Sequence, residues 1–109
     1  MTELTLLQSR EGIEGFELHG HCGYADAGYD IVCSAVSALT QTAAMALEQI
    51  LHLQIALEIE EGEMTCILPA QMDDGIYRQA QLILETMLLG LRDIAETYSD
   101  YINISERTV

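Results

Sequence analysis

Residues 54–69, QIALEIEEGEMTCILP, contain two short runs in which apolar and polar residues alternate, and the runs meet at Glu61-Gly62. Alternation of this kind is typical of half-buried strands, and a short turn between two such runs indicates a β-hairpin. The pattern predicts strands over residues 54–60 and 63–68, with Pro69 ending the second because proline cannot donate to a strand ladder. Helical patterns flank this hairpin on both sides, so we expect a mixed fold.

Apolar residues from Ile31 to Ile50 recur at helical spacing and predict a helix of roughly 20 residues. Asp73 or Asp74 can cap a second helix. Its apolar stripe comprises Ile76, Ala80, Ile83, Leu84, Met87, Leu88, Leu91 and Ile94. Residues 2–8 and 13–21 predict a further hairpin and residues 100–106 a last strand. The order ββαββαβ predicts an α+β two-layer sandwich, one domain over 1–109, with both helices on one face of a mostly antiparallel sheet.

Composition excludes some classes of function. The chain has 18 acidic residues against four basic ones, a net charge of −14, which repels nucleic acid and favours a basic protein partner. It has no apolar run of about 18 residues and no basic N-terminal leader, so we expect a cytoplasmic protein that does not enter membranes. Three cysteines make no disulfide framework, and a reducing compartment leaves them as thiols.

The segment 19–39, HGHCGYADAGYDIVCSAVSAL, places scarce histidines and cysteines on either side of a loop. Asp30 directly precedes the helical pattern and is a candidate N-cap. This start would put Cys33 in the first helical turn, where unpaired amides and the helix dipole lower the pKa of a thiol. His21, at the end of the preceding strand, can serve as its base across the loop. The residues leave two interpretations of Cys33 open: a nucleophile with a histidine base, and an ordinary buried core residue.

Other residues could support this site. The amides of Ser34 and Ala35 are candidate oxyanion donors at the expected helix start, and Ser37 lies on the same helical flank as Cys33. Cys66 alternates with apolar residues in a predicted strand, so we assign it to the core.

Two alternatives remain open from the residues. One is a zinc site built from His19, His21, Cys22 and Cys33, which lacks the paired Cys-x-x-Cys spacing of strong zinc motifs. The other is a non-enzymatic acidic adaptor that docks on a basic protein, with structural cysteines. The adaptor predicts that Cys33→Ala leaves function intact.

The segments GHCGYADAGYDIVCSAVSALTQT (20–42) and AQLILETMLLGLRDIAETY (80–98) resemble the ribosomal-processing cysteine protease family, Prp. The resemblance implies a homodimeric α+β thiol protease that needs no metal or cofactor. It also implies a substrate, the precursor of large-subunit ribosomal protein twenty-seven, from which the enzyme removes an N-terminal extension during ribosome biogenesis.

Carried over to this sequence, the family's nucleophile falls on Cys33 and its general base on His21. Asp30 falls on the acidic position of the motif, and Gly20 and Gly28 fall on its glycines. The loop of residues 22–29, which includes Gly23, corresponds to a family segment expected to order over substrate. Cys22 departs from the family, which typically has alanine there. Cys22 is either a buried small residue or a redox partner that forms a disulfide with Cys33 and switches the enzyme off.

Overall fold

The computed structural model of the chain describes residues 1–20 and 27–109, and only the backbone of residues 27–30. In these ranges it contains five strands and two helices: β1 (Thr2–Gln8), β2 (Ile13–His19), α1 (Ala27–Gln49), β3 (Ala56–Glu60), β4 (Glu63–Ile67), α2 (Asp74–Thr97) and β5 (Ile102–Thr108). The predicted order ββαββαβ and the α+β class are confirmed.

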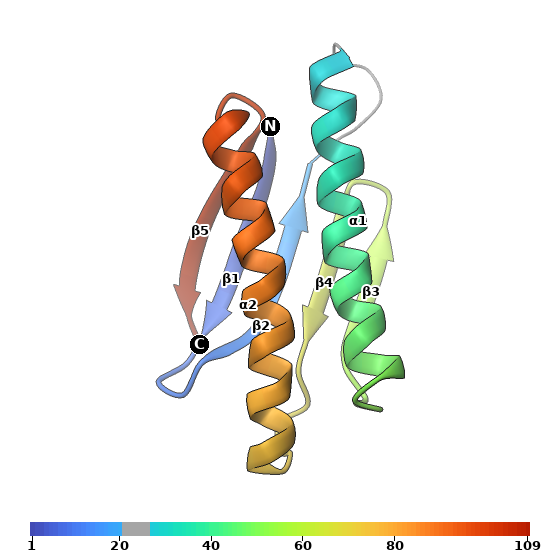
Figure 1. Cartoon of the computed structure of the whole chain (residues 1–109), viewed down its shortest axis with the longest axis vertical. Helices are drawn as coiled ribbons and strands as arrows, with labels where there is room; N and C mark the ends of the chain where they lie inside the picture. The colour runs from blue at the N-terminus through green and yellow to red at the C-terminus, as the bar shows by residue number, and fades with distance from the viewer. Residues whose placement is uncertain (21–26) are drawn as a thin grey trace.

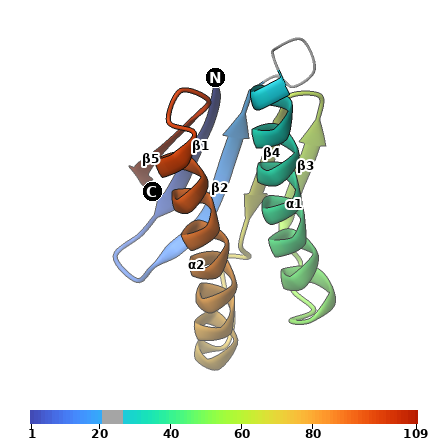
Figure 2. The ribbon, with the colours of Figure 1, turned by 45° about the horizontal axis from the view of Figure 1, so that its top comes forward.

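The strands form one sheet in the order β3-β4-β2-β1-β5. The β1–β2, β2–β4 and β3–β4 pairs are antiparallel, whereas β5 runs parallel to β1, with Thr2 opposite Ile102. Both helices cover the same face of the sheet (Figure 2). α1 lies along the β3–β4 half and α2 along the other half (Figure 1). The core is therefore a single layer of side chains between the sheet and the helix pair.

The alternation of the strands and the spacing of the helices explain which side chains fill this core. The largest fully buried side chains come from β1, β2, β4 and both helices: Leu4, Leu6, Phe16, Val32, Val36, Thr40, Leu47, Cys66, Leu84 and Leu91. Cys66 is in the core as predicted. Ile31 and Ile50, at the ends of the first predicted helical pattern, are exposed instead. By length and hydropathy, Ile31–Gln49 would also suit a membrane span, but here its apolar side packs in the core.

The two ends of the segment before α1 differ from the sequence prediction. β2 ends at His19, not at residue 21, and α1 begins at Ala27, four residues before the expected start at Ile31. Gly28 and Asp30 have low helix propensity, which is why the sequence favours a later start. The packing of the helix that follows overrides this local preference. By contrast, Asp73 caps α2 as predicted, and its Oδ2 accepts from the amide of Gly75 at 2.9 Å.

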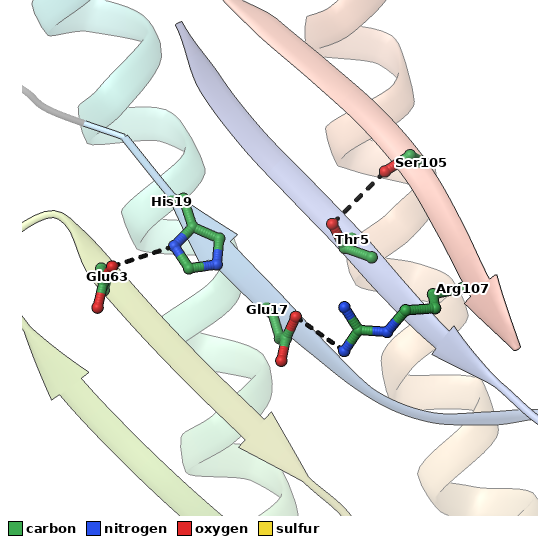
Figure 3. Close-up of polar contacts among 6 residues, drawn as sticks. All are labelled: Thr5, Glu17, His19, Glu63, Ser105 and Arg107. Atoms are coloured by element: carbon green, nitrogen blue, oxygen red, sulfur yellow. Dashed lines mark hydrogen bonds and ion pairs between the residues drawn. The ribbon is translucent and has the colours of Figure 1, made fainter. Parts of the chain in front are cut away.

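The sheet face opposite the helices carries a row of polar contacts (Figure 3). Thr5 meets Ser105 at 3.5 Å between β1 and β5, Glu17 pairs with Arg107 at 3.0 Å, and His19 Nδ1 lies 3.3 Å from a carboxylate oxygen of Glu63. Because these groups are largely exposed, each contact contributes little to stability.

Candidate active site

Cys33 lies in the second turn of α1, on the side that faces the sheet, and is only 4% exposed. Its side chain lines a small pocket of about 100 Å³. The pocket is lined by the start of β1, the end of β2, one flank of α1 and the β3–β4 hairpin: Thr2, Leu18, Gly20, Cys33, Val36, Ser37, Thr40, Gln41, Ile59, Glu60, Gly62, Glu63 and Met64. The candidate nucleophile is therefore at a junction of several elements.

β1 brings a hydroxyl to the cysteine. Thr2 Oγ1 lies 3.6 Å from Cys33 Sγ in a buried contact between residues 31 apart in the chain. Sequence reasoning missed Thr2. The signal was the alternation of β1, which places Thr2 on the same face as the core residues Leu4 and Leu6.

Gly20, the residue that follows β2, lies beside Thr2 at the same pocket. Gly20 has a φ of +152°, and its amide donates to the carbonyl of Gly62 in the β3–β4 turn at 2.9 Å. A β-carbon on Gly20 would lie 2.8 Å from Thr2 Cα. The chain therefore leaves β2 one residue before His21, in contact with the threonine that touches Cys33.

Several predicted site residues fall in or beside the part of the chain that is not described. His21, Cys22 and Gly23 lie outside the described residues, and the pairing of Cys33 with His21 or with Cys22 stays a prediction. The backbones of Gly28 and Asp30 lie in the first turn of α1. The prediction that Asp30 is the N-cap is wrong, because the helix starts three residues before it.

Because α1 starts earlier than expected, Cys33 does not lie in the first helical turn, where the helix dipole would lower the pKa of its thiol. The dipole acts mainly within the first turn, and only the first four amides of a helix lack partners inside it. Cys33 is the seventh residue of α1, and the amides of Ser34 and Ala35 come after it. These amides belong to the regular helix, so they are not the free oxyanion donors that the sequence suggested.

Ser37, one turn after Cys33, lines the same pocket and is half-buried. Its carbonyl accepts a 3.3 Å hydrogen bond from the hydroxyl of Thr40, which also donates to Val36 at 2.9 Å. These bonds within α1 keep the Thr40 hydroxyl satisfied in the core and fix the pocket wall beside Cys33.

The cysteines of the chain differ in state. Cys33 is in the disulfide-bonded form, so it must be reduced before it can act as a nucleophile. Cys66 is a free, buried thiol, and burial, with a smaller contribution from the charge of Glu48, raises its pKa to about 12. Cys66 is therefore inert as a nucleophile near neutral pH. Cys22 lies outside the described residues.

The described members of the alternative zinc set do not come together. His19 projects from the sheet face opposite the helices, toward Glu63 (Figure 3), whereas Cys33 is on α1 at the other face. Among the described residues no group of three or more His, Cys, Asp or Glu could hold a metal ion. His52 follows the far end of α1, well away from the pocket.

Comparisons with known proteins bear directly on this site. Residues 1–103 match the family model described as cysteine protease Prp. The chain is also 30% identical, over the full length of both proteins, to the ribosomal processing cysteine protease Prp of Bacillus subtilis.

The chain belongs to the cysteine protease Prp family. It is accordingly a cysteine protease. The structure agrees: SMU.848 from Streptococcus mutans superposes with a TM-score of 0.86 at 30% identity, covering 100% of this chain and 96% of that one. An essential ribosomal processing protease Prp from S. aureus, in complex with a substrate peptide, shares the fold with a TM-score of 0.85 at 24% identity, covering 98% and 100%.

Proposed function

We propose that this cysteine protease is an endopeptidase that removes the N-terminal extension of the precursor of large-subunit ribosomal protein twenty-seven, with Cys33 as nucleophile and His21 as general base. The observation that carries the proposal is the pocket that is lined both by Cys33 and by Gly20, the residue before His21. By contrast, Cys66 is buried in the core with a pKa of about 12. Cys33 is therefore the better candidate of these two thiols.

The reaction is an acyl transfer that starts from reduced Cys33. His21 takes the thiol proton, and the thiolate attacks the scissile carbonyl carbon to form a tetrahedral intermediate. When this collapses, the peptide C–N bond breaks, and the leaving amine takes the proton from His21. Water then hydrolyses the thioester, releases the new carboxylate and restores the thiol. We also propose that the segment after Gly20 orders over the substrate, with Gly23 giving it conformational freedom. Gly28 lies in the first turn of α1 and not in the loop of residues 22–29 that the sequence predicted.

The charge of the chain supports a basic substrate. The chain carries a net charge of −14, and a surface of this sign raises the rate of encounter with a basic partner. Ribosomal proteins are generally basic, and the Bacillus subtilis relative bears the name of a ribosomal processing protease.

Mass spectrometry of the full-length ribosomal protein after incubation with reduced enzyme tests the proposal. We expect wild-type protein and Cys66→Ala, which loses a thiol outside the pocket, to release one defined N-terminal peptide. Cys33→Ala and His21→Ala are expected to release none. Cleavage by Cys33→Ala at the wild-type rate would refute the assignment. A folded wild-type protein that binds the ribosomal protein without cutting it would favour the acidic adaptor.

Further parts of the proposal concern assembly, location and redox state. We place the enzyme in the cytoplasm as a homodimer. Light scattering coupled to size-exclusion chromatography tests the dimer.

We also propose that Cys22 is the redox partner of Cys33, a proposal supported by the disulfide-bonded form of Cys33. Peptide mapping after peroxide treatment would show a linked Cys22–Cys33 peptide, and its absence would rule out this switch.

A further inference from the structure

We propose that Thr2 is a positioning residue of the nucleophile: its hydroxyl donates a hydrogen bond to Cys33 Sγ and stabilises the thiolate. The inference rests on the proposed function, in which Cys33 attacks the substrate. It adds a residue from the first strand to a site that the sequence motif places entirely between residues 20 and 37.

The site needs such a group because Cys33 is buried. Cys66, which is 1% exposed, shows what burial does to a thiol in this core, since its pKa is about 12. Cys33 is 4% exposed and lies beyond the first turn of α1, where the helix dipole is weak. His21, as the proposed base, supplies one favourable partner. A hydrogen-bond donor at the sulfur supplies another, because donors to the charged form of a group favour that form.

The geometry of Thr2 fits this role. In the disulfide-bonded form that the structure shows, the Oγ1–Sγ distance is 3.6 Å, which is within the range of hydrogen bonds to sulfur, and both residues are buried. Reduction leaves the sulfur on the same side chain, within reach of the hydroxyl. A thiolate has no proton and can only accept, so the hydroxyl must be the donor to it. The hydroxyl therefore interacts more strongly with the thiolate than with the neutral thiol.

The backbone of Thr2 is paired with β5, and this pairing keeps its side chain on the sheet face that carries the core and Cys33. Its amide donates to the carbonyl of Tyr101 at 2.8 Å, and the residue lies opposite Ile102 in the parallel β1–β5 ladder. On its other side, a β-carbon on Gly20 would lie 3.0 Å from Thr2 Oγ1. The glycine thus leaves the room that the hydroxyl occupies.

The test is the pH dependence of Cys33 alkylation by iodoacetamide in the fully reduced protein, followed at the Cys33 peptide by mass spectrometry. Thr2→Val keeps the shape of the side chain and removes the hydroxyl. We expect it to raise the pKa of Cys33 by about one unit, so that alkylation at neutral pH falls about tenfold. Thr2→Ser is expected to restore most of the reactivity.

Thr5→Val is the matched control, because it makes the same substitution on the same strand at a hydroxyl that meets Ser105 on the opposite sheet face. Its alkylation profile should equal that of the wild type. If Thr2→Val does not fold, Thr2→Ala removes the hydroxyl without adding bulk and gives the same test. A purely structural role would lower the melting temperature and leave the pKa of Cys33 unchanged.

The outcomes separate this inference from the function on which it rests. If cleavage requires Cys33 but a folded Thr2→Val or Thr2→Ala variant keeps the wild-type alkylation profile, the inference is wrong and the proposed function stands. If Cys33→Ala cleaves normally, the proposed function fails, whatever the Thr2 variants show. A raised pKa in Thr2→Val, with recovery in Thr2→Ser, supports the inference.

Discussion

Replacing Gly20 by alanine is expected to cost both stability and Cys33 reactivity, because this glycine is where β2 meets β1 beside the pocket. Two effects add. The φ of +152° lies in a region that L-residues rarely adopt, a strain of about 1–3 kcal/mol. The new β-carbon would also lie 2.8 Å from Thr2 Cα, and this contact cannot be relieved by a side-chain rotation because the backbone of β1 must move.

Forcing extra volume into a packed site costs about 1–3 kcal/mol, so we expect Gly20→Ala to lower the free energy of unfolding by about 2–6 kcal/mol. This is a large part of the stability of an ordinary domain, which is about 5–15 kcal/mol. Urea unfolding followed by circular dichroism measures the change. Alkylation of reduced Cys33 should slow in the same variant, since the displaced backbone carries the Thr2 hydroxyl away from the sulfur.

Gly62→Ala is the matched control, because Gly62 also has a positive φ, of +76°, in the β3–β4 turn. Alanine there is expected to cost about 1–2 kcal/mol from strain alone. A loss below about 1 kcal/mol in Gly20→Ala, or a loss no larger than in Gly62→Ala, would contradict the contact with β1 as the main cause.

Three further predictions concern the scaffold. Leu84→Ala is expected to lower the free energy of unfolding by about 2–5 kcal/mol because Leu84 is fully buried. The control Leu82→Ala changes an exposed residue and should alter the free energy of unfolding by less than about 0.5 kcal/mol. Equal urea midpoints for the two variants would contradict the prediction. Asp73→Ala should cost about 1 kcal/mol by leaving amides at the start of α2 unpaired, and an unchanged melting temperature would argue against the cap. Burial and the hydrogen bond to Glu14 raise the pKa of Tyr77 to about 12, so the neutral form of this side chain stabilises the fold. We expect this stabilisation to be present below about pH 10 and to be lost as the pH rises through 12. An absorbance titration of Tyr77 with a midpoint near 10 would refute the prediction.

Local patterns were sufficient for most of the architecture. Strand alternation gave the two hairpins, helical spacing gave the buried stripe of α2, and Asp73 marked the start of that helix. These signals are strong because each depends on residues a few positions apart, whose burial repeats with the period of the element. The start of α1 was misplaced because the low helix propensity of Gly28 and Asp30 suggested a later start, and the packing of the helix that follows overrides this preference.

By itself, the sequence determined the class of the fold, the core faces and the motif that singles out Cys33 and His21. Only the tertiary structure showed that β5 pairs in parallel with β1, that His19 faces away from the helix layer, and that Thr2 touches Cys33. The physical reason is the range of the interactions. Strand order and the Thr2–Cys33 contact join residues far apart in the chain, so they arise only when the whole core packs, and no local pattern encodes them.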